Sequence, residues 1–350
     1  KKGECWIAYT NPTTHKIILD NIQRSPLCGR DFEYFSEDPI LAGRMAAAYV
    51  RGIQKNGISA CPKHFAVNSQ ELRRMASDSV LDERTLRELY LTGFEIVVKE
   101  AKPKTIMTSY NLINGTYANE NAHLLQDILR KDWGFDGAVV TDWGGSNDHA
   151  LGVKNGSTLE MPCPGGDSIR ELMKAVQDGK ISEADVDARL DEMLELVLST
   201  HAAVEKAPRT FDAAAHHKLA RRAAAESIVL LKNEGGILPL KPNEKLAVIG
   251  DFAETPRYQG AGSSAVNALQ VDTLLDSIKA DDSGITLVGY ASGFERQGAA
   301  DAEKLEEAVA LAKKADTVLL CLGLDELRES EGLDRSDMKL AENQQQLLAA

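Results

Sequence analysis

The sequence predicts an α/β protein built on parallel strands, and two observations lead to that prediction. Short apolar runs alternate along the chain with apolar residues at helical spacing. Parallel strands need a crossover connection, usually a helix, so this alternation is typical of a parallel sheet. The apolar runs in the first part of the chain also end in polar or special residues. Such endings are typical of a barrel or open sheet whose chemistry lies at the carboxyl ends of its strands.

The elements of the first part follow from the spacing of apolar residues. Four short apolar runs predict strands at residues 58–63, 105–110, 137–141 and 157–161. Apolar residues three or four positions apart predict helices over 86–97 and 124–129. Ser182 and Asp185 have the spacing of a capping box, which predicts that a third helix begins there and continues through Val197.

Residues 201–211 interrupt this pattern and predict a linker, because Ala-Pro-Arg-Thr stands between two helical stretches. The second part alternates again, with helices predicted at 213–227, 273–279, 305–312 and 342–350 and strands at 246–250, 285–289 and 317–322. We therefore divide the chain into a first domain (1–205), a linker and helix (206–224) and a second domain (225–350).

The composition excludes several classes of protein. The chain has 350 residues, with 40 Lys and Arg against 53 Asp and Glu, a net charge of −13. A nucleic-acid binder needs a basic surface for phosphates, and a membrane span needs an apolar run of about 20 residues; the sequence has neither. The five cysteines lie far apart, and no His, Asp or Glu cluster has the spacing of metal ligands. We therefore expect no nucleic acid, no membrane, no metal and no cofactor.

An acidic residue follows the predicted strand 137–141, in the segment Thr141-Asp142-Trp143-Gly-Gly145. A carboxylate at a strand end can act as a covalent nucleophile, and an aromatic ring beside it can stack on the apolar face of a sugar. The two glycines permit a tight turn and close approach of a ligand. An Asp here can equally cap the turn that follows, so this segment alone leaves both interpretations open.

Cationic side chains gather at the end of the first predicted strand, where Lys63 and His64 lie, with Arg74 behind them. Such donors can bind several hydroxyl groups or one anion. A Lys-His pair is more often solvated surface. Tyr110 and Asp142 end neighbouring predicted strands, however, and their shared edge favours a binding site.

Two segments of the second part have competing interpretations. Glu331 lies in a charged loop after the predicted strand 317–322, and by composition alone this loop is typical of a solvated surface. Gly260-Ala-Gly-Ser-Ser-Ala265 matches the dinucleotide pattern G-x-G-x-x-A. That pattern must directly follow a strand and open a helix, and this segment does neither, so nucleotide binding is disfavoured.

Six motifs occur in order along the chain: Arg24-Ser-Pro-Leu-Cys-Gly-Arg-Asp-Phe-Glu-Tyr-Phe-Ser-Glu-Asp-Pro39, Lys63-His-Phe-Ala-Val-Asn68, Met107-Thr-Ser-Tyr-Asn111, Val140-Thr-Asp-Trp143, Ser227-Ile-Val-Leu-Leu-Lys-Asn233 and Glu331-Gly-Leu-Asp-Arg335. Together they resemble glycoside hydrolase family 3, most of all its β-glucosidases. The resemblance covers nearly the whole chain from residue 21 onward.

The resemblance implies a (β/α)8-type barrel followed by an α/β sandwich, with the active site between them. Asp142 falls on the position of the family's nucleophile, and Glu331 falls on that of its general acid/base. Further positions resemble residues that bind the sugar (Arg30, Lys63, His64, Arg74 and Tyr110) or that form the pocket walls (Met107 and Trp143).

The implied activity is retaining exo-hydrolysis, which releases terminal non-reducing β-D-glucose from β-glucosides or cello-oligosaccharides through a glycosyl-aspartate. An acidic chain suits such a neutral substrate, because sugars are bound by hydrogen bonds and stacking. A β-xylosidase or another family specificity, and a non-catalytic sugar-binding fragment, remain open alternatives. The N-acetylglucosaminidase branch fits less well, since it has K-H-F-P-G where this chain has Lys63-His-Phe-Ala-Val67.

The chain departs from the family pattern in its length. About five strand signals precede the linker, whereas a closed barrel needs eight. Residues 1–20 do not resemble the strand that the family has there, and the second domain stops one helix after Glu331. We expect that these 350 residues do not complete the fold alone, and that a homo-oligomer or a second piece of chain completes it.

Overall fold

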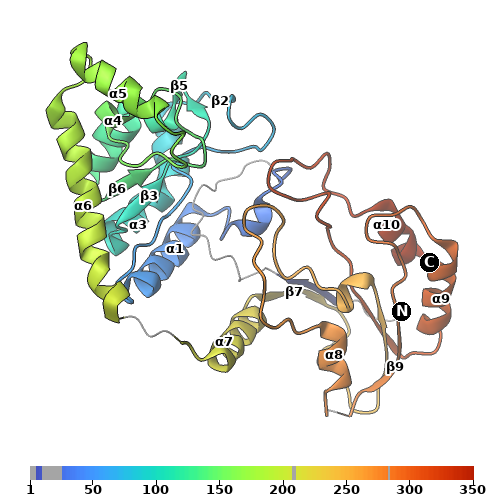
Figure 1. Cartoon of the computed structure of the whole chain (residues 1–350). Coiled ribbons are helices and arrows are strands. Elements are labelled where there is room, and N and C mark those ends of the chain that lie inside the picture. Colours follow the sequence, from blue (N-terminus) through green and yellow to red (C-terminus); the bar gives the residue numbers. More distant parts are fainter. Residues whose placement is uncertain (1–4, 10–25, 207–209, 283) are drawn as a thin grey trace. The chain divides into compact units, whose positions relative to one another are not determined.

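The computed structural model describes residues 5–9, 26–206, 210–282 and 284–350, which form two units (Figure 1). The first comprises the described residues of His15–Phe211, and the second comprises Asp212–Ala350 with the strand β1 (Cys5–Tyr9). From the sequence, the residues of β1 were assigned to the first domain. The strand instead belongs to the second unit, because it pairs with a strand of that unit. Arg24 and Ser25, which begin the first family motif, lie outside the described residues.

The first unit contains, in order, η1 (Asp31–Glu33), α1 (Pro39–Gln54), β2 (Asp78–Ser79), α2 (Glu83–Thr85), η2 (Leu86–Leu91), α3 (Thr92–Ala101), β3 (Thr105–Met107), β4 (Leu112–Ile113), β5 (Thr116–Tyr117), η3 (Ala118–Glu120), η4 (His123–Asp132), β6 (Ala138–Val140), α4 (His149–Asn155), α5 (Asp167–Gln177) and α6 (Glu183–Lys206). The three predicted helices are present as η2 with α3, η4, and α6. Helix α1 was not predicted, because its buried stripe is mostly alanine and therefore gives weak periodicity.

Four segments of the first unit run in parallel. Strands β3 and β6 pair along their length, and Phe65 and Leu159 extend the row at its two sides through single pairs with Thr108 and Val140. The predicted strand at 105–110 is therefore confirmed over its first three residues, 105–107, and that at 137–141 over 138–140.

Neither of the other two predicted strands forms a regular strand: Leu159 makes its single pair within 157–161, whereas Phe65 lies two residues beyond the predicted strand 58–63. Pro62 has no N–H to donate to a ladder, although its carbonyl accepts from the Met107 amide at 3.0 Å. Thr158 and Leu159 both donate to the carbonyl of Val139, at 2.8 and 2.9 Å, so the register is irregular there. Regular pairing is thus lost at both sides of the row.

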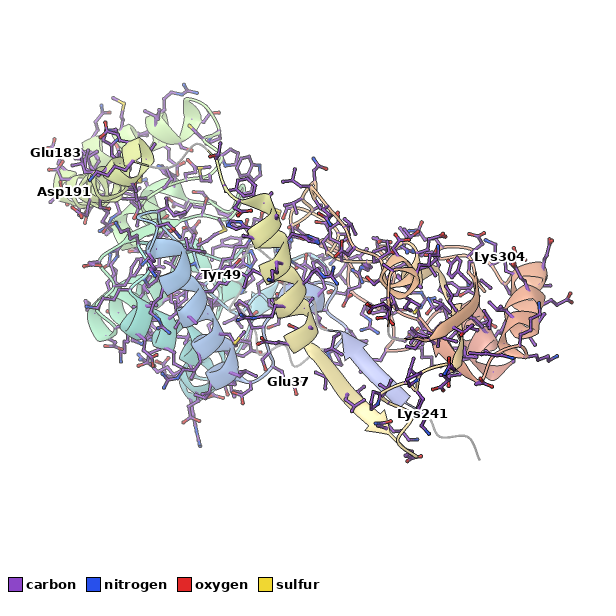
Figure 2. The ribbon with its side chains drawn as sticks, turned by 90° about the horizontal axis from the view of Figure 1, so that it is seen from below. Glu37, Tyr49, Glu183, Asp191, Lys241 and Lys304 are labelled. Carbon is purple, nitrogen blue, oxygen red and sulfur yellow. The ribbon has the colours of Figure 1, made fainter. Side chains whose placement is uncertain are left out.

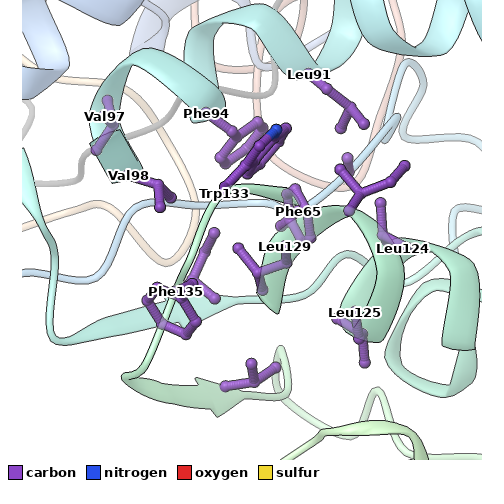
Figure 3. Close-up of a cluster of buried hydrophobic side chains, with 14 of the residues drawn as sticks. Phe65, Leu91, Phe94, Val97, Val98, Leu124, Leu125, Leu129, Trp133 and Phe135 are labelled. Atoms are coloured by element: carbon purple, nitrogen blue, oxygen red, sulfur yellow. The ribbon is translucent and has the colours of Figure 1, made fainter. Parts of the chain in front are cut away.

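Aromatic and aliphatic side chains from the parallel row, α3 and η4 pack together in a buried cluster (Figure 3). The ring of Phe65 packs edge-on against those of Phe94 and Trp133, with centroids 5.1 and 5.8 Å away. Phe65 and Phe94 are fully buried. Because Phe65 follows His64 in the chain, this cluster anchors the segment that carries the predicted cationic residues.

The capping box predicted at the start of α6 is confirmed. The Ser182 amide donates to the Asp185 carboxylate at 2.9 Å, and the Asp185 amide donates to Ser182 Oγ at 3.2 Å. Helix α6 continues to Lys206, so the first residues of the predicted linker 201–211 are helical. Residues 207–209 of that linker lie outside the described residues.

The second unit contains α7 (Ala213–Glu226), β7 (Ile228–Asn233), β8 (Lys245–Ile249), η5 (Asp251–Ala253), α8 (Leu274–Lys279), β9 (Thr286–Ala291), α9 (Ala302–Ala312), β10 (Thr317–Leu320) and α10 (Glu342–Ala349). Its parallel sheet has the order β10-β8-β9, and the central strand β8 is buried after its first residue. All the elements predicted for this part are present. A continuous apolar run is typical of such a central parallel strand.

Strands β7 and β1 form a separate antiparallel pair in the second unit, and α7 leads directly into β7 (Figure 2). β7 was not predicted as a strand, although its residues belong to a family motif. Four successive apolar side chains from Ile228 to Leu231 are exposed, so β7 lacks the alternation that marks a half-buried strand. Within the described residues, no helix combines the length and the apolar character that crossing a membrane requires.

Candidate active site

Asp142 lies at the carboxyl edge of the parallel row in the first unit. It follows β6 by two residues, and its side chain is mostly buried. The apolar residues Ala138, Val139 and Val140 are buried as the strand pattern requires, so the strand brings the carboxylate to the edge of the sheet. The glycine that follows Trp143 has φ +79°, a conformation that favours glycine, and the chain turns there.

Within the part of the chain that the structure describes, two groups contact the Asp142 carboxylate. Oδ1 accepts a hydrogen bond from the Trp143 amide at 2.7 Å, and Oδ2 lies 3.3 Å from Nε2 of His64. The His64 side chain is fully buried, and it can donate to the carboxylate when Nε2 carries a proton. The structure therefore brings together the ends of two strands that the sequence analysis placed at one edge.

Tyr110 and Arg74 extend this group. The Tyr110 hydroxyl donates to the Trp143 carbonyl at 2.9 Å, which ties the turn after Asp142 to the neighbouring strand end. The Arg74 guanidinium lies over the Tyr110 ring, 4.8 Å from its centroid, and pairs with the buried Glu71 carboxylate at 2.8 Å. Trp143 itself is 64% exposed, so a ligand can reach it.

Lys63 and Met107 belong to the same strand ends. The Met107 carbonyl accepts from the Phe65 amide at 2.7 Å, so Met107 lies beside the Lys63–Phe65 segment. Lys63 and Asp142 also act on one neighbour, the buried thiol of Cys61. Burial raises the pKa of this thiol to about 11, and among the smaller effects the Lys63 charge lowers it and the Asp142 charge raises it.

Arg30 is held in a buried ion pair. Its guanidinium contacts the Glu33 carboxylate one turn further on, and both side chains are almost completely inaccessible. Arg30 was predicted to bind the sugar, and its partner Glu33 was not predicted. A buried Arg needs a partner carboxylate, and this pair fixes the loop that carries the first family motif.

Glu120 is a residue of this site that was not predicted from the sequence. Its carboxylate Oε1 accepts from the amides of Asn147 and Asp148 at 2.9 and 2.7 Å, so it secures the loop that follows Asp142. Burial raises the pKa of Glu120 above its usual range, although these two hydrogen bonds act to lower it. Nothing in its sequence context distinguishes it from a solvated acid.

Glu331, the predicted acid/base of the second unit, lies in the segment between β10 and α10 and is half-buried. Its amide donates to the Ala261 carbonyl at 3.1 Å, and its Oε2 accepts from the Ser263 amide at 2.6 Å. Among the described residues, no group of three or more His, Cys, Asp or Glu side chains could hold a metal ion.

Fold and site together define an α/β protein that presents a carboxylate, a histidine and an exposed aromatic ring at the carboxyl edge of parallel strands. The model of the glycosyl hydrolase family 3 N-terminal domain matches residues 18–196, and that of the family's C-terminal domain matches residues 228–350. The chain belongs to glycosyl hydrolase family 3.

Curated relatives agree with this assignment. The chain is 45% identical over 334 residues to thermostable β-glucosidase B of Acetivibrio thermocellus, and 44% identical over 338 residues to an exo-α-(1→6)-L-arabinopyranosidase of Bifidobacterium breve. Each match covers 94% of this chain and 44% of the relative. The chain thus spans less than half the length of these relatives.

Solved structures give the same relationship. The crystal structure of a family 3 β-glucosidase from Bifidobacterium adolescentis matches with a TM-score of 0.88 and 43% identity, covering 94% of this chain and 48% of that one. β-Glucosidase 3B from Thermotoga neapolitana, solved with glucose, matches with a TM-score of 0.83 and 34% identity, covering 94% and 50%.

Proposed function

We propose that this protein is a retaining exo-glycoside hydrolase that releases terminal non-reducing β-D-glucose from β-glucosides or cello-oligosaccharides. The observation that carries the proposal is Asp142, a carboxylate at a strand end in contact with a buried histidine, in a chain of family 3. Relatives named β-glucosidase support the choice of sugar.

In the proposed first step, Asp142 attacks the anomeric carbon as the glycosidic C–O bond breaks, and Glu331 gives its proton to the leaving oxygen. The products are a glycosyl-aspartate and the free aglycone alcohol. The step requires the two carboxyl groups to lie about 5–5.5 Å apart when substrate is bound. The Trp143 amide supports the role of Asp142, because a hydrogen bond to Oδ1 orients the carboxylate.

In the proposed second step, the Glu331 carboxylate takes a proton from water as the water oxygen attacks the anomeric carbon. The bond between that carbon and Asp142 breaks, so the carboxylate is regenerated and glucose leaves with its original configuration. One residue thus serves as acid and then as base, as microscopic reversibility requires.

We propose that the polar groups around Asp142 bind the hydroxyl groups of the sugar. His64, Lys63, Arg74 and Tyr110 support this role because their segments meet at one edge of the sheet. The exposed Trp143 ring offers a face on which the sugar can stack, with Met107 as a second wall. Arg30 is assigned to sugar binding by resemblance only.

We further propose that the parallel row is part of a (β/α)8-type barrel and that the second unit is part of an α/β sandwich. A homo-oligomer or a second piece of chain would then complete the fold. Intact mass and sedimentation of the active species test this: 38.0 kDa for an active monomer would contradict it.

A second candidate activity rests on a specific observation. Relatives at 44 and 45% identity are named exo-α-(1→6)-L-arabinopyranosidase. The decisive experiment is therefore a hydrolysis screen over p-nitrophenyl β-glucoside, β-xyloside and α-L-arabinopyranoside. We expect the largest kcat/KM for the β-glucoside. A larger value for either pentoside would show that the enzyme prefers that pentose to glucose at the cleaved position.

The non-catalytic alternative is separated by binding. Glucose titration followed by calorimetry is run beside the hydrolysis screen on the same preparation. Glucose binding with no hydrolysis of any aryl glycoside would favour a sugar-binding fragment and contradict the proposed activity.

A further inference from the structure

The glycine-rich segment Gly260–Ser264 packs against Glu331. The Ala261 carbonyl accepts from the Glu331 amide at 3.1 Å, and the Ser263 amide donates to Glu331 Oε2 at 2.6 Å. Both the backbone and the carboxyl group of Glu331 are therefore attached to one short turn. This is the segment that matched the dinucleotide pattern, and its partner in the structure is a side chain of the protein.

Gly262 permits this close approach. Its φ is +109°, and a Cβ atom added to it would stand 2.4 Å from Cβ of Glu331 and 2.8 Å from Oε2. Such distances do not occur between real side chains, so any larger residue would force Glu331 or the turn itself to shift. A glycine is required here both for the backbone conformation and for the space.

Arg257 holds the part of the Glu331 loop that precedes Glu331. Nη1 contacts the Glu329 carboxylate at 2.7 Å and donates to the Leu324 carbonyl at 3.2 Å, while Nη2 donates to the Glu329 carbonyl at 2.8 Å. The planar guanidinium can make these contacts together, which a lysine cannot. The loop is thus fixed two residues before Glu331 and again at Glu331.

We propose that residues 257–263 form a positioning cradle for Glu331, in which Arg257 fixes the loop and the Gly262–Ser263 turn sets the plane of the carboxyl group. The inference rests on the proposed function, in which Glu331 is the acid/base. Arg257, Gly262 and Ser263 are positioning residues, since they act through Glu331. A displaced Glu331 would protonate leaving groups poorly while attack by Asp142 continued.

The test measures dependence on the leaving group in the Gly262→Ala variant. Cellobiose is a substrate with a poor leaving group, the second glucose. With it we expect kcat/KM to fall about 10²-fold, the lower end of what general acid catalysis contributes. With 2,4-dinitrophenyl β-glucoside, which leaves without protonation, we expect a loss below about 10-fold on the same reasoning. Glu331→Ala is measured in parallel, as the variant that lacks the proposed acid/base carboxyl group altogether.

Azide provides a second readout that a merely structural defect would not produce. Azide needs no general base: it attacks the anomeric carbon of the glycosyl-aspartate, the bond to Asp142 breaks, and β-glucosyl azide forms. We expect azide to raise kcat of both Gly262→Ala and Glu331→Ala with the dinitrophenyl substrate, and to leave the wild type unchanged.

Gly236→Ala is the matched control. Gly236 also has a positive φ, +64°, but apart from its chain neighbours no atom of the described residues lies within 4 Å of an added Cβ, so the variant carries backbone strain without a clash. Its kcat/KM should fall equally little for all leaving groups. Thermal melts of all variants report folding, and Arg257→Lys gives a second perturbation, with a smaller shift in the same direction, if Gly262→Ala unfolds.

The outcomes separate the two levels of inference. If Glu331→Ala shows leaving-group dependence and azide rescue but Gly262→Ala and Arg257→Lys lose activity equally on all substrates, the cradle is wrong and the proposed function stands. If Glu331→Ala shows neither effect, the assignment of the acid/base itself is wrong.

Discussion

The two carboxylates assigned to catalysis are supported in different ways. Asp142 ends a buried strand, and its neighbour His64 is anchored by Phe65 in the hydrophobic cluster. Glu331 lies outside the regular elements and is held by contacts with another loop. A strand end inherits its position from the core of its unit, whereas a loop residue needs dedicated partners.

This difference predicts different patterns of sensitivity. Changes near Asp142 should affect every substrate, because the nucleophile acts whatever the leaving group is. Changes near Glu331 should affect poor leaving groups most. The following four substitutions test the first half of this comparison, from the largest expected effect to the smallest.

Asp142→Asn should have the largest effect. The amide cannot form the glycosyl ester, and loss of a nucleophile costs about 10⁴-fold or more in kcat. Hydrolysis of all three aryl glycosides should be lost while the thermal melt stays close to that of the wild type. If the variant kept activity within 10-fold of the wild type on any of the three aryl glycosides, Asp142 would not be the nucleophile.

Phe65→Ala should be the next largest. Removing a fully buried phenylalanine typically costs about 3–5 kcal/mol of unfolding free energy, and the cluster beneath His64 would be left with a cavity. Urea titration measures this loss. Phe294→Ala, a change at a 2% exposed phenylalanine in the second unit, should cost a similar amount yet leave the rate of Asp142 glycosylation unchanged. If Phe294→Ala lowered the rate of Asp142 glycosylation as much as Phe65→Ala does, the distinction between the two units would be refuted.

His64→Asn should lower kcat/KM by about 10²-fold for good and poor leaving groups alike, the effect expected when a reacting group loses its orientation. Steady-state kinetics with cellobiose and the dinitrophenyl glucoside measure it. His123→Asn, at an exposed histidine paired with Glu83, serves as the control and should be silent. A defect confined to poor leaving groups would assign His64 to proton transfer instead.

Tyr110→Phe should have the smallest effect. It removes the 2.9 Å hydrogen bond to the Trp143 carbonyl, and one such bond contributes about 0.5–1.5 kcal/mol. We expect kcat/KM to fall up to about 10-fold, since 1.4 kcal/mol corresponds to a factor of ten. Tyr90→Phe, at a partly buried tyrosine beside the hydrophobic cluster, should change nothing. A loss of 10²-fold or more would show that the Tyr110 hydroxyl contributes to sugar binding well beyond this one hydrogen bond.

Much of the fold was predictable because the relevant signals are local. The apolar runs around Val139 and Val248 and the capping box at Ser182 each depend on a few neighbouring residues, and the structure confirms them. The antiparallel pairing of β1 with β7 was not predictable, because it joins residues far apart in the chain. The irregular pairing at Pro62 has a local cause that the strand prediction left out, since proline has no N–H to donate.

The site was predictable where residues follow strands, and not elsewhere. The strand pattern placed His64 and Asp142 at one edge, and the structure brings them to 3.3 Å. Glu120 and Gly262 act on partners 27 and 69 residues away, since Glu120 holds the Asn147 amide and Gly262 faces Glu331. No local pattern marks such residues, and Gly262 was instead part of a misleading nucleotide motif.

The most direct test of the central claim is covalent labelling with an activated 2-fluoro β-glucoside, followed by peptic digestion and mass spectrometry. The fluorine slows both steps and a good leaving group restores the first, so the glycosyl-enzyme accumulates. We predict one fluoroglucosyl adduct, on the peptide that contains Asp142, and none in Asp142→Asn. An adduct on any other residue, or turnover with no covalent adduct, would contradict the assignment of Asp142 as the nucleophile.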